Sequence, residues 1–218
     1  PWWCLHWPRY DQLFEEPKII MRQTSDSIRC VYDESGYYVL NSILVFKKNS
    51  ERYSYKYIAA VLNSTLTDYL YKKLTQEEGR TFAEVKPANV RKLYIPKATR
   101  EEQDLLSILY DYLVFLKNPN QTDSFVSLNS MFIDLFEKII DGCVYELLFR
   151  EHMKEREIDI MSYLYQQIKP IEGLSDQDKN NIIISVHSNI FMTDNPARAR
   201  LKLFVSRSPE YLKPIIQH

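Results

Sequence analysis

Apolar residues near the start of the chain follow patterns that are typical of β-strands. A short apolar run follows Pro17 and covers 17–22. Residues 28–33 alternate apolar and polar side chains, and residues 37–46 are rich in Tyr, Val, Ile and Leu, which favour strands. Turn-forming residues at 33–36 separate the second run from the third. The pattern predicts three strands, and their close spacing favours an antiparallel meander.

The pattern then changes to helical spacing. From 55 to 74 the apolar residues recur at steps of three and four positions, which predicts one long amphipathic helix. We expect its apolar stripe to be buried. Residues 82–96 are expected to be extended, because Pro87 and Pro96 disfavour helix in the residues before them.

The rest of the chain is predicted to be helical. Thr99 and Glu102 form the Thr-x-x-Glu pattern of a capping box, which predicts a helix reaching residue 117. Helix-breaking residues at 118–121 give the best candidate domain boundary. Further helices are expected at 125–150, 157–168, 175–189, 196–205 and 210–216. The predicted fold class is therefore α+β, with a mixed or antiparallel sheet and packed helices at 1–117, followed by an all-helical region at 118–218.

Composition excludes several common kinds of site. Among 218 residues there are only 4 Gly, too dispersed to form the Gly-rich loop of a dinucleotide fold, a P-loop or a kinase. The 3 Cys and 4 His show neither a Cys-x-x-Cys pair nor a helical His pair, so we expect no disulfide framework and no metal site. A reducing, cytoplasmic location follows from this cysteine usage. No apolar run reaches the roughly 18 residues that span a bilayer, so we expect no membrane partner.

The charge is unevenly distributed along the chain. Residues 1–100 carry 16 Lys/Arg against 11 Asp/Glu, a net charge of +5, whereas residues 101–218 carry 12 against 18, a net charge of −6. A polyanion would be attracted to the first half and repelled by the second. The charge split is therefore compatible with a polyanion such as nucleic acid as a partner of the first half, although +5 over 100 residues is a modest excess that chance also produces.

Basic residues interleaved with aromatic ones form the candidate DNA-binding set. They lie on the predicted strands, at a strand end, or in and beside the extended segment. Arg can donate two hydrogen bonds to guanine and Lys can contact phosphate, so both suit a DNA surface. The set consists of Arg22, Arg29, Lys47, Lys48, Arg80, Lys86, Arg91 and Lys92.

Two short motifs suggest catalysis only weakly. Glu84-Val85-Lys86 matches the end of many nuclease metal sites, with Asp68 as the nearest upstream carboxylate. Asp194-Asn195-Pro196 resembles the start of an amino-methylating motif, but the second proline and the stacking aromatic that the motif needs are absent. We therefore predict no catalytic site in this chain, and no cofactor bound to it.

Several segments are informative when they are read in order. They are Arg9-Tyr10 with Phe14, Pro17-Lys18-Ile19-Ile20 with Arg22, the segment 33–38, the segment 57–64, and the segment 90–96. The most specific pair is Leu62-Asn63-Ser64 within a predicted helix and Leu93-Tyr94-Ile95-Pro96 further along the chain. Together they resemble the target-recognition region of TaqI-like, type IIG restriction–modification methyltransferases, over residues 9–97. The segments 140–149 and 195–198 resemble the helical tail that often follows this region.

The resemblance implies a DNA target-recognition fragment. In that family an upstream domain binds S-adenosylmethionine and methylates adenine, and the downstream region reads the DNA sequence. None of the upstream motifs is present here, so the resemblance implies double-stranded DNA and an upstream methyltransferase domain of the same polypeptide as partners. It implies a site-specific adenine methyltransferase as the parent, with or without endonuclease activity. Family members recognise different sites, so base-contacting residues are not transferred to these positions.

Two other interpretations stay open at this stage. The aromatic N-terminus and the acidic helices would also suit a protein-interaction module with no direct DNA readout. A stand-alone hydrolase has only the Glu84/Lys86 fragment in its favour. The salt dependence of DNA affinity separates the first alternative from DNA recognition, because phosphate contacts release counterions.

Overall fold

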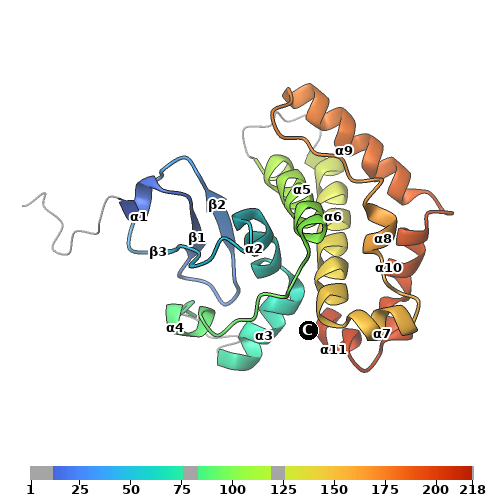
Figure 1. The fold of residues 1–218 in the computed structure, drawn as a ribbon, viewed down its shortest axis with the longest axis horizontal. Helices are drawn as coiled ribbons and strands as arrows, with labels where there is room; N and C mark the ends of the chain where they lie inside the picture. The colour runs from blue at the N-terminus through green and yellow to red at the C-terminus, as the bar shows by residue number, and fades with distance from the viewer. Residues whose placement is uncertain (1–11, 76–82, 119–125, 218) are drawn as a thin grey trace, which may run out of the picture.

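The computed structural model describes residues 12–75, 83–118 and 126–217. In this part of the chain a three-stranded antiparallel sheet lies on one side of the molecule, and most of the helices lie on the other (Figure 1). Helices α2 (Tyr55–Leu62) and α5 (Arg100–Leu116) lie between the two. The predicted α+β class with a helical C-terminal region is confirmed.

The strand order differs from the predicted one. The sheet consists of β1 (Lys18–Arg22), β2 (Cys30–Asp33) and β3 (Ile43–Phe46), preceded by the short helix α1 (Gln12–Glu15). Its order is β2-β1-β3, with β1 antiparallel to both neighbours. The meander prediction is therefore wrong, because β3 pairs with β1 and not with β2. The third strand is also shorter than the predicted 37–46.

The connection between β2 and β3 explains this order. It turns at Gly36, whose φ of 77° lies in the region that favours glycine. The next residues contact α1, where the rings of Tyr38 and Phe14 stack with centroids 4.9 Å apart. The chain then turns again, with the Ile43 N–H donating to the Leu40 carbonyl at 3.0 Å. This path is long enough to carry the chain past β1 before β3 begins.

The sheet has two unlike faces, because successive side chains of a strand point to opposite sides. Its inner face carries Ile19, Met21, Leu44 and Phe46. These side chains pack with Leu62, Val85 and Val90 in a small hydrophobic core. The outer face carries Ile20, Arg22, Arg29, Val31 and Ile43 and is partly exposed. The inner face therefore fixes the sheet to the helices, and the outer face is available for contacts.

The long helix predicted over 55–74 is two helices. Helix α2 ends at Leu62 and α3 (Thr65–Thr75) begins after the intervening Asn63 and Ser64, so the prediction of one continuous helix is wrong. Asn and Ser side chains can form hydrogen bonds with the nearby backbone in competition with the helix. Here the Ser64 hydroxyl donates to the Val61 carbonyl at 2.7 Å and accepts from the Thr67 N–H at 3.3 Å.

The break also changes which residues are buried. Leu62 and Leu66 are 6% and 3% exposed, but Leu70 and Leu74, which the pattern places in the same buried stripe, are 40% and 43% exposed. The change of direction at residues 63–64 moves the end of α3 away from the core. The prediction of a buried stripe therefore holds for the first part of the segment and is wrong for the last.

The segment before α5 is only partly extended. Helix α4 (Pro87–Val90) lies within it, so the extended prediction is wrong for these residues. Proline is tolerated there because it lies in the first turn of the helix, where its missing N–H is not needed. The predicted capping box of α5 is confirmed, with the Thr99 N–H donating to Glu102 at 2.7 Å and the Glu102 N–H donating to Thr99 at 3.3 Å.

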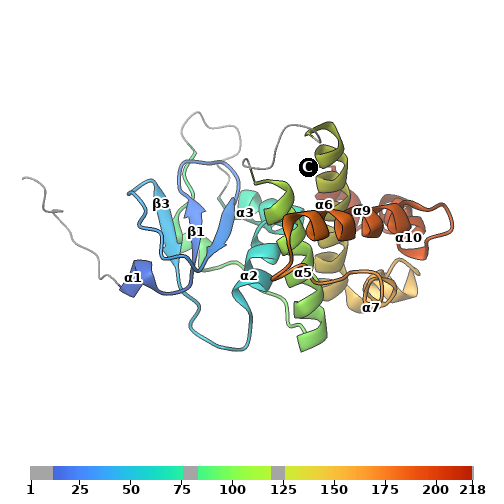
Figure 2. The ribbon, with the colours of Figure 1, turned by 90° about the horizontal axis from the view of Figure 1, so that it is seen from above.

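Six helices make up the described C-terminal region. They are α6 (Val126–Leu148), α7 (Arg150–Glu155), α8 (Met161–Leu164), α9 (Asp176–Phe191), α10 (Pro196–Arg207) and α11 (Leu212–Ile216). Ser175 caps the start of α9 and Asn195 caps the start of α10, with Pro196 in the first turn of α10. The helix predicted over 157–168 is wrong in length, because only α8 forms there. Figure 2 shows α5 and α6 side by side between the sheet and the last helices.

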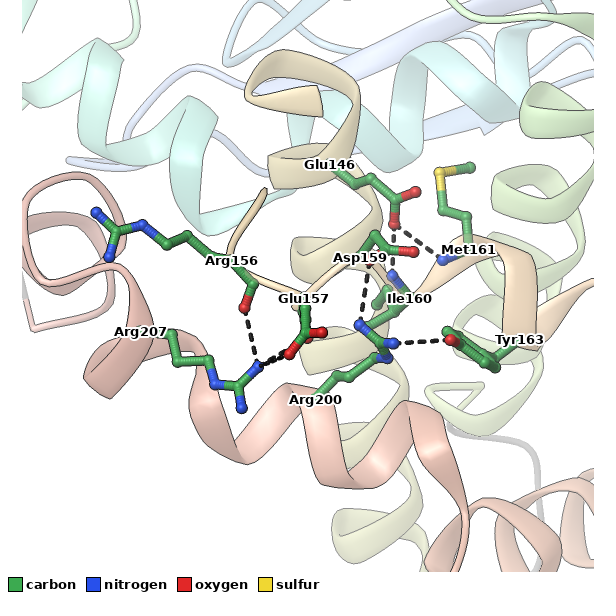
Figure 3. Close-up of polar contacts among 9 residues, drawn as sticks. All are labelled: Glu146, Arg156, Glu157, Asp159, Ile160, Met161, Tyr163, Arg200 and Arg207. Carbon is green, nitrogen blue, oxygen red and sulfur yellow. Dashed lines mark hydrogen bonds and ion pairs between the residues drawn. The ribbon is translucent and has the colours of Figure 1, made fainter. Parts of the chain in front are cut away.

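Helix α6 is approached closely by later parts of the chain. A Cβ atom at Gly142 would lie 2.6 Å from the side chain of Ile160 and 3.0 Å from the ring of Phe204, so any larger residue here would have to displace these side chains. One helical turn further on, the buried Glu146 carboxylate accepts hydrogen bonds from the Ile160 and Met161 N–H groups at 2.6 and 2.9 Å (Figure 3). Burial raises the pKa of Glu146, although these two donors oppose the shift. The two residues fix the α7–α8 connection against α6.

Two arginines of α10 hold the same connection from the other side (Figure 3). Arg200 donates to the Asp159 carboxylate at 3.1 Å and to the Tyr163 hydroxyl at 2.7 Å. Arg207 donates to the Glu157 carboxylate at 3.1 Å. Glu157 has a φ of 52°, in the left-handed region, which is unfavourable for a residue other than glycine. The contacts around this turn must therefore hold it in that conformation. These ion pairs therefore serve packing between helices.

The main hydrophobic core extends from the sheet-proximal helices into the C-terminal helices. Helix α5 contacts α2 on one side and α6 on the other. On α5, the Tyr110 hydroxyl accepts the Tyr32 N–H of β2 at 2.8 Å, and the Tyr112 ring packs edge-on against Phe136 at 5.1 Å. None of the described helices is long and apolar enough to cross a membrane.

Candidate nucleic-acid interface

Arg22 and Arg29 lie opposite each other at one end of the sheet. Met21 pairs with Cys30 in the β1–β2 register, and the Arg22 N–H donates to the Arg29 carbonyl at 3.0 Å, which continues that register by one residue. Both side chains belong to the outer face and both residues are exposed. Neither has a carboxylate partner within the described residues; Arg29 donates only to the Ile28 carbonyl, at 3.3 Å. Two uncompensated guanidinium groups therefore stand side by side.

A shallow hollow of about 320 Å³ adjoins these two arginines on the outer face. Its apolar wall is formed by the strands themselves, and Val31 is 37% exposed there. The lining residues are Ile20, Met21, Arg22, Arg29, Cys30, Val31 and Ile43. The two cations therefore stand at the edge of an apolar floor, so a partner there would need both negative charge and apolar surface.

The segment around α4 lies beside the connection between β1 and β2 (Figure 1). The Val85 N–H donates to the Gln23 carbonyl at 2.8 Å, and Thr24 forms a β-bridge with Glu84. Exposed Arg91 and Lys92 follow at the end of α4, and neither has a carboxylate partner among the described residues. Lys86, also exposed, begins the same helix. The structure thus gathers Lys86, Arg91 and Lys92 at the end of the domain that holds Arg22 and Arg29.

Lys47 and Lys48 are placed differently. They follow β3 at the opposite end of the sheet, where Phe46 pairs with Ile19. Lys47 forms an ion pair with Glu16, and Lys48 one with Glu51 at 2.6 Å. Phosphate would therefore have to displace a carboxylate from each of these lysines. The predicted residue Arg80 lies outside the described residues.

The two carboxylates of the suggested nuclease fragment differ in their contacts. The Asp68 side chain pairs with Lys72 at 3.2 Å and accepts the Ile28 N–H at 3.4 Å, whereas Glu84 contributes its backbone to the bridge with Thr24 and is exposed. In the described parts of the chain, no group of three or more His, Cys, Asp or Glu could hold a metal ion. The fragment therefore gains no support from the geometry.

Sequence reasoning missed a cleft between the sheet and the helices. It measures about 650 Å³ and is lined by β2, α2, α3, α5 and α6, with Arg29 at its margin. Within it, the carboxylate of Asp141 on α6 accepts two hydrogen bonds from Thr65, the first residue of α3. The Thr65 N–H donates at 2.7 Å and the Thr65 hydroxyl at 2.5 Å. Burial raises the pKa of Asp141 to about 6. Asp141 and Thr65 are far apart in the sequence, so no spacing pattern in the sequence predicts this contact or the cleft around it.

Taken together, the site defines a class of protein: an α+β module that presents exposed arginines and lysines from one end of a small antiparallel sheet, as a polyanion-binding surface requires. Within this class, residues 5–95 match the family model of the TaqI-like C-terminal specificity domain. The resemblance inferred from the sequence is therefore confirmed for this part of the chain. A search of curated proteins found no match. The family match supports a target-recognition role in restriction–modification.

Proposed function

We propose that this chain is the DNA-reading part of a site-specific adenine methyltransferase of a restriction–modification system, with or without endonuclease activity in the parent. In this proposal an upstream domain of the same polypeptide binds S-adenosylmethionine and carries the chemistry, and the present chain selects the site on double-stranded DNA. The cytoplasm, where that DNA lies, would be its location. The family match over residues 5–95 supports the recognition role.

The observation that carries the proposal is the exposed pair Arg22 and Arg29 at the end of β1 and β2. A major groove admits a two-stranded β-ribbon, and a guanidinium group can donate two hydrogen bonds to the O6 and N7 atoms of guanine. Arg91, Lys92 and Lys86 lie close to the same end, where phosphate oxygens on either side of the groove would be within reach. Arg22 and Arg29 therefore read bases in this proposal, and the α4 cations hold the backbone.

DNA affinity at several salt concentrations tests this function. Arg22→Ala or Arg29→Ala should each lower affinity for the preferred duplex by about 1–3 kcal/mol and reduce the preference over a scrambled duplex. Arg91→Ala with Lys92→Ala should instead weaken binding to all sequences alike and flatten the salt dependence by about one unit of slope per lost phosphate contact. Lys47→Ala and Lys48→Ala should also weaken binding to all sequences alike, but by less, because carboxylate partners already compensate the charge of these two lysines.

Lys202→Ala provides the matched control. Lys202 is an exposed lysine of α10 without a carboxylate partner among the described residues, so its removal changes net charge by the same amount far from the proposed site. DNA affinity of this variant should equal that of the wild type. If it loses as much affinity as Arg22→Ala, the charge effect is general and the placement is wrong. No DNA binding by the wild-type chain would overturn the proposal in favour of a protein-interaction module.

A further inference from the structure

One strongly exposed apolar side chain stands beside the proposed DNA site. Leu40 is 80% exposed, more than Val31 or the neighbouring Tyr37, which are 37% and 65% exposed. It lies in the connection between β2 and β3. Exposure on this scale has a free-energy cost in water that a partner with apolar surface would remove.

Hydrogen bonds fix the position of Leu40 relative to Arg22. The Leu40 carbonyl accepts the Ile43 N–H at 3.0 Å, which closes a four-residue turn. Ile43 pairs directly with Arg22 across the β1–β3 ladder, and the Gln23 N–H donates to the Ser42 carbonyl at 2.9 Å. The ends of such a turn are less than about 7 Å apart and paired Cα atoms are about 5 Å apart, so Leu40 lies within about 12 Å of Arg22.

That separation corresponds to a few base-pair steps of DNA, at about 3.4 Å each. Arg22, Arg29 and Leu40 would thus meet neighbouring base pairs in one groove. The major groove displays a single apolar group, the C5-methyl of thymine, and proteins recognise it through apolar side chains. Uncompensated arginines next to an exposed leucine fit a partner that offers both negative charge and this methyl group.

We propose that Leu40 is a specificity-determining residue that contacts a thymine methyl group in the major groove. This inference rests on the proposed DNA-reading function and adds a base identity to it. Arg22 and Arg29 select guanine by hydrogen bonds, and Leu40 selects thymine over cytosine and uracil by removing the methyl group from water. Leu40 carries no charge, so its contribution is independent of salt.

Uracil provides the test, because it keeps every hydrogen-bonding group of thymine and lacks only the methyl. Duplexes that the full-length chain selects from random sequences are synthesised once with thymine and once with uracil. The wild type should bind the thymine duplexes about fourfold more tightly for each methyl group contacted, from a burial energy of about 0.8 kcal/mol per carbon. Leu40→Ala should reduce this ratio towards one and leave the slope of affinity against salt unchanged.

Two further variants make the result specific. Leu40→Met, which keeps the apolar contact, should restore most of the thymine preference. Leu174→Ala, a change at an exposed leucine of the helical region, should keep the full wild-type ratio. Equal binding of thymine and uracil duplexes by the wild type, or an undiminished ratio in Leu40→Ala, would overturn the inference and leave Leu40 as a protein contact. Failure of the wild type to select any duplex would overturn the proposed function as well.

Discussion

Asn63 shows how a single side chain joins the two structural elements that hold the site. Its side-chain oxygen accepts the Cys30 N–H at 3.0 Å, and its amide group donates to the Cys30 carbonyl at 2.8 Å and to the Ala59 carbonyl at 2.9 Å. Cys30 belongs to β2, an edge strand, so these bonds satisfy backbone groups that otherwise have no strand partner. Asn63, which follows the last residue of α2, therefore also fixes β2, the strand that begins directly after Arg29.

Asp141 gives a pH-dependent prediction at the same scale. Burial raises its pKa in the folded protein to about 6, above the value near 4 expected in the unfolded chain. The folded state therefore binds more protons between these values, and the free energy of unfolding should fall as pH rises from about 4 to about 6. Asp141→Asn keeps hydrogen bonds to Thr65 without titrating. Its stability relative to the wild type should increase by about 1–3 kcal/mol over this range, as measured by urea unfolding at each pH.

Asp134→Asn is the control for that measurement. Asp134 lies on the same helix and is exposed, so its replacement removes a carboxylate without affecting Thr65. A pH-dependent change in stability that both variants share would come from the loss of a carboxylate on α6 and not from the burial of Asp141. A stability difference between Asp141→Asn and the wild type that does not change with pH would mean that solvent reaches the Asp141 carboxylate and that burial does not raise its pKa.

At the scale of elements, the break between α2 and α3 decides which apolar residues form the core. The periodic pattern treats Leu62 and Leu74 as equivalent, but Leu62 is 6% exposed and Leu74 is 43% exposed. Leu62→Ala should lower the free energy of unfolding by about 2–5 kcal/mol, because it removes a buried side chain and leaves a cavity. Leu74→Ala should change it by only about 0.5 kcal/mol, as is usual at the surface. Chemical denaturation of both variants tests this, and equal losses would argue for one continuous, buried helix.

The same elements show what the sequence can and cannot predict. Strand β1 and the capping box of α5 were predictable, because each depends on residues that are close together in the chain. The strand order was not, because it depends on contacts between α1 and the β2–β3 connection. Of the candidate site, Arg22 and Arg29 were predictable as basic residues on strands. Their juxtaposition, and the carboxylates that compensate Lys47 and Lys48, depend on tertiary structure.

At the scale of the whole molecule, α5 links the sheet to the C-terminal helices. The Tyr110 hydroxyl accepts a hydrogen bond from the Tyr32 N–H of β2. The Tyr112 hydroxyl donates to the Lys169 carbonyl at 2.5 Å and accepts the Lys169 N–H at 3.0 Å. Two residues apart on one helix, these tyrosines bind opposite halves of the protein. The predicted boundary between 117 and 118 thus directly follows a helix that belongs to the shared core.

A shared core predicts that the chain unfolds as one unit. Calorimetry of residues 1–218 should show a single transition whose calorimetric and van't Hoff enthalpies agree. Tyr112→Ala should shift this transition to lower temperature without splitting it, because the lost packing against Phe136 weakens both halves together. Two separate transitions in the wild type would instead support independent domains at 1–117 and 118–218.

The way in which β2 is held has a consequence for how such a protein could acquire new target sites. The side chains of Asn63 and Tyr110 accept backbone N–H groups of this strand, and Ile28, which is fully buried, fixes the residues just before it. Thr24 and Asp26 in the hairpin tip are exposed. Loops that carry binding residues on a rigid scaffold tolerate change. The tip can therefore exchange hydroxyl, amide and carboxylate groups, each suited to a different base edge, while the scaffold keeps its stability. Evolution of specificity would then proceed by substitution in a few tip residues.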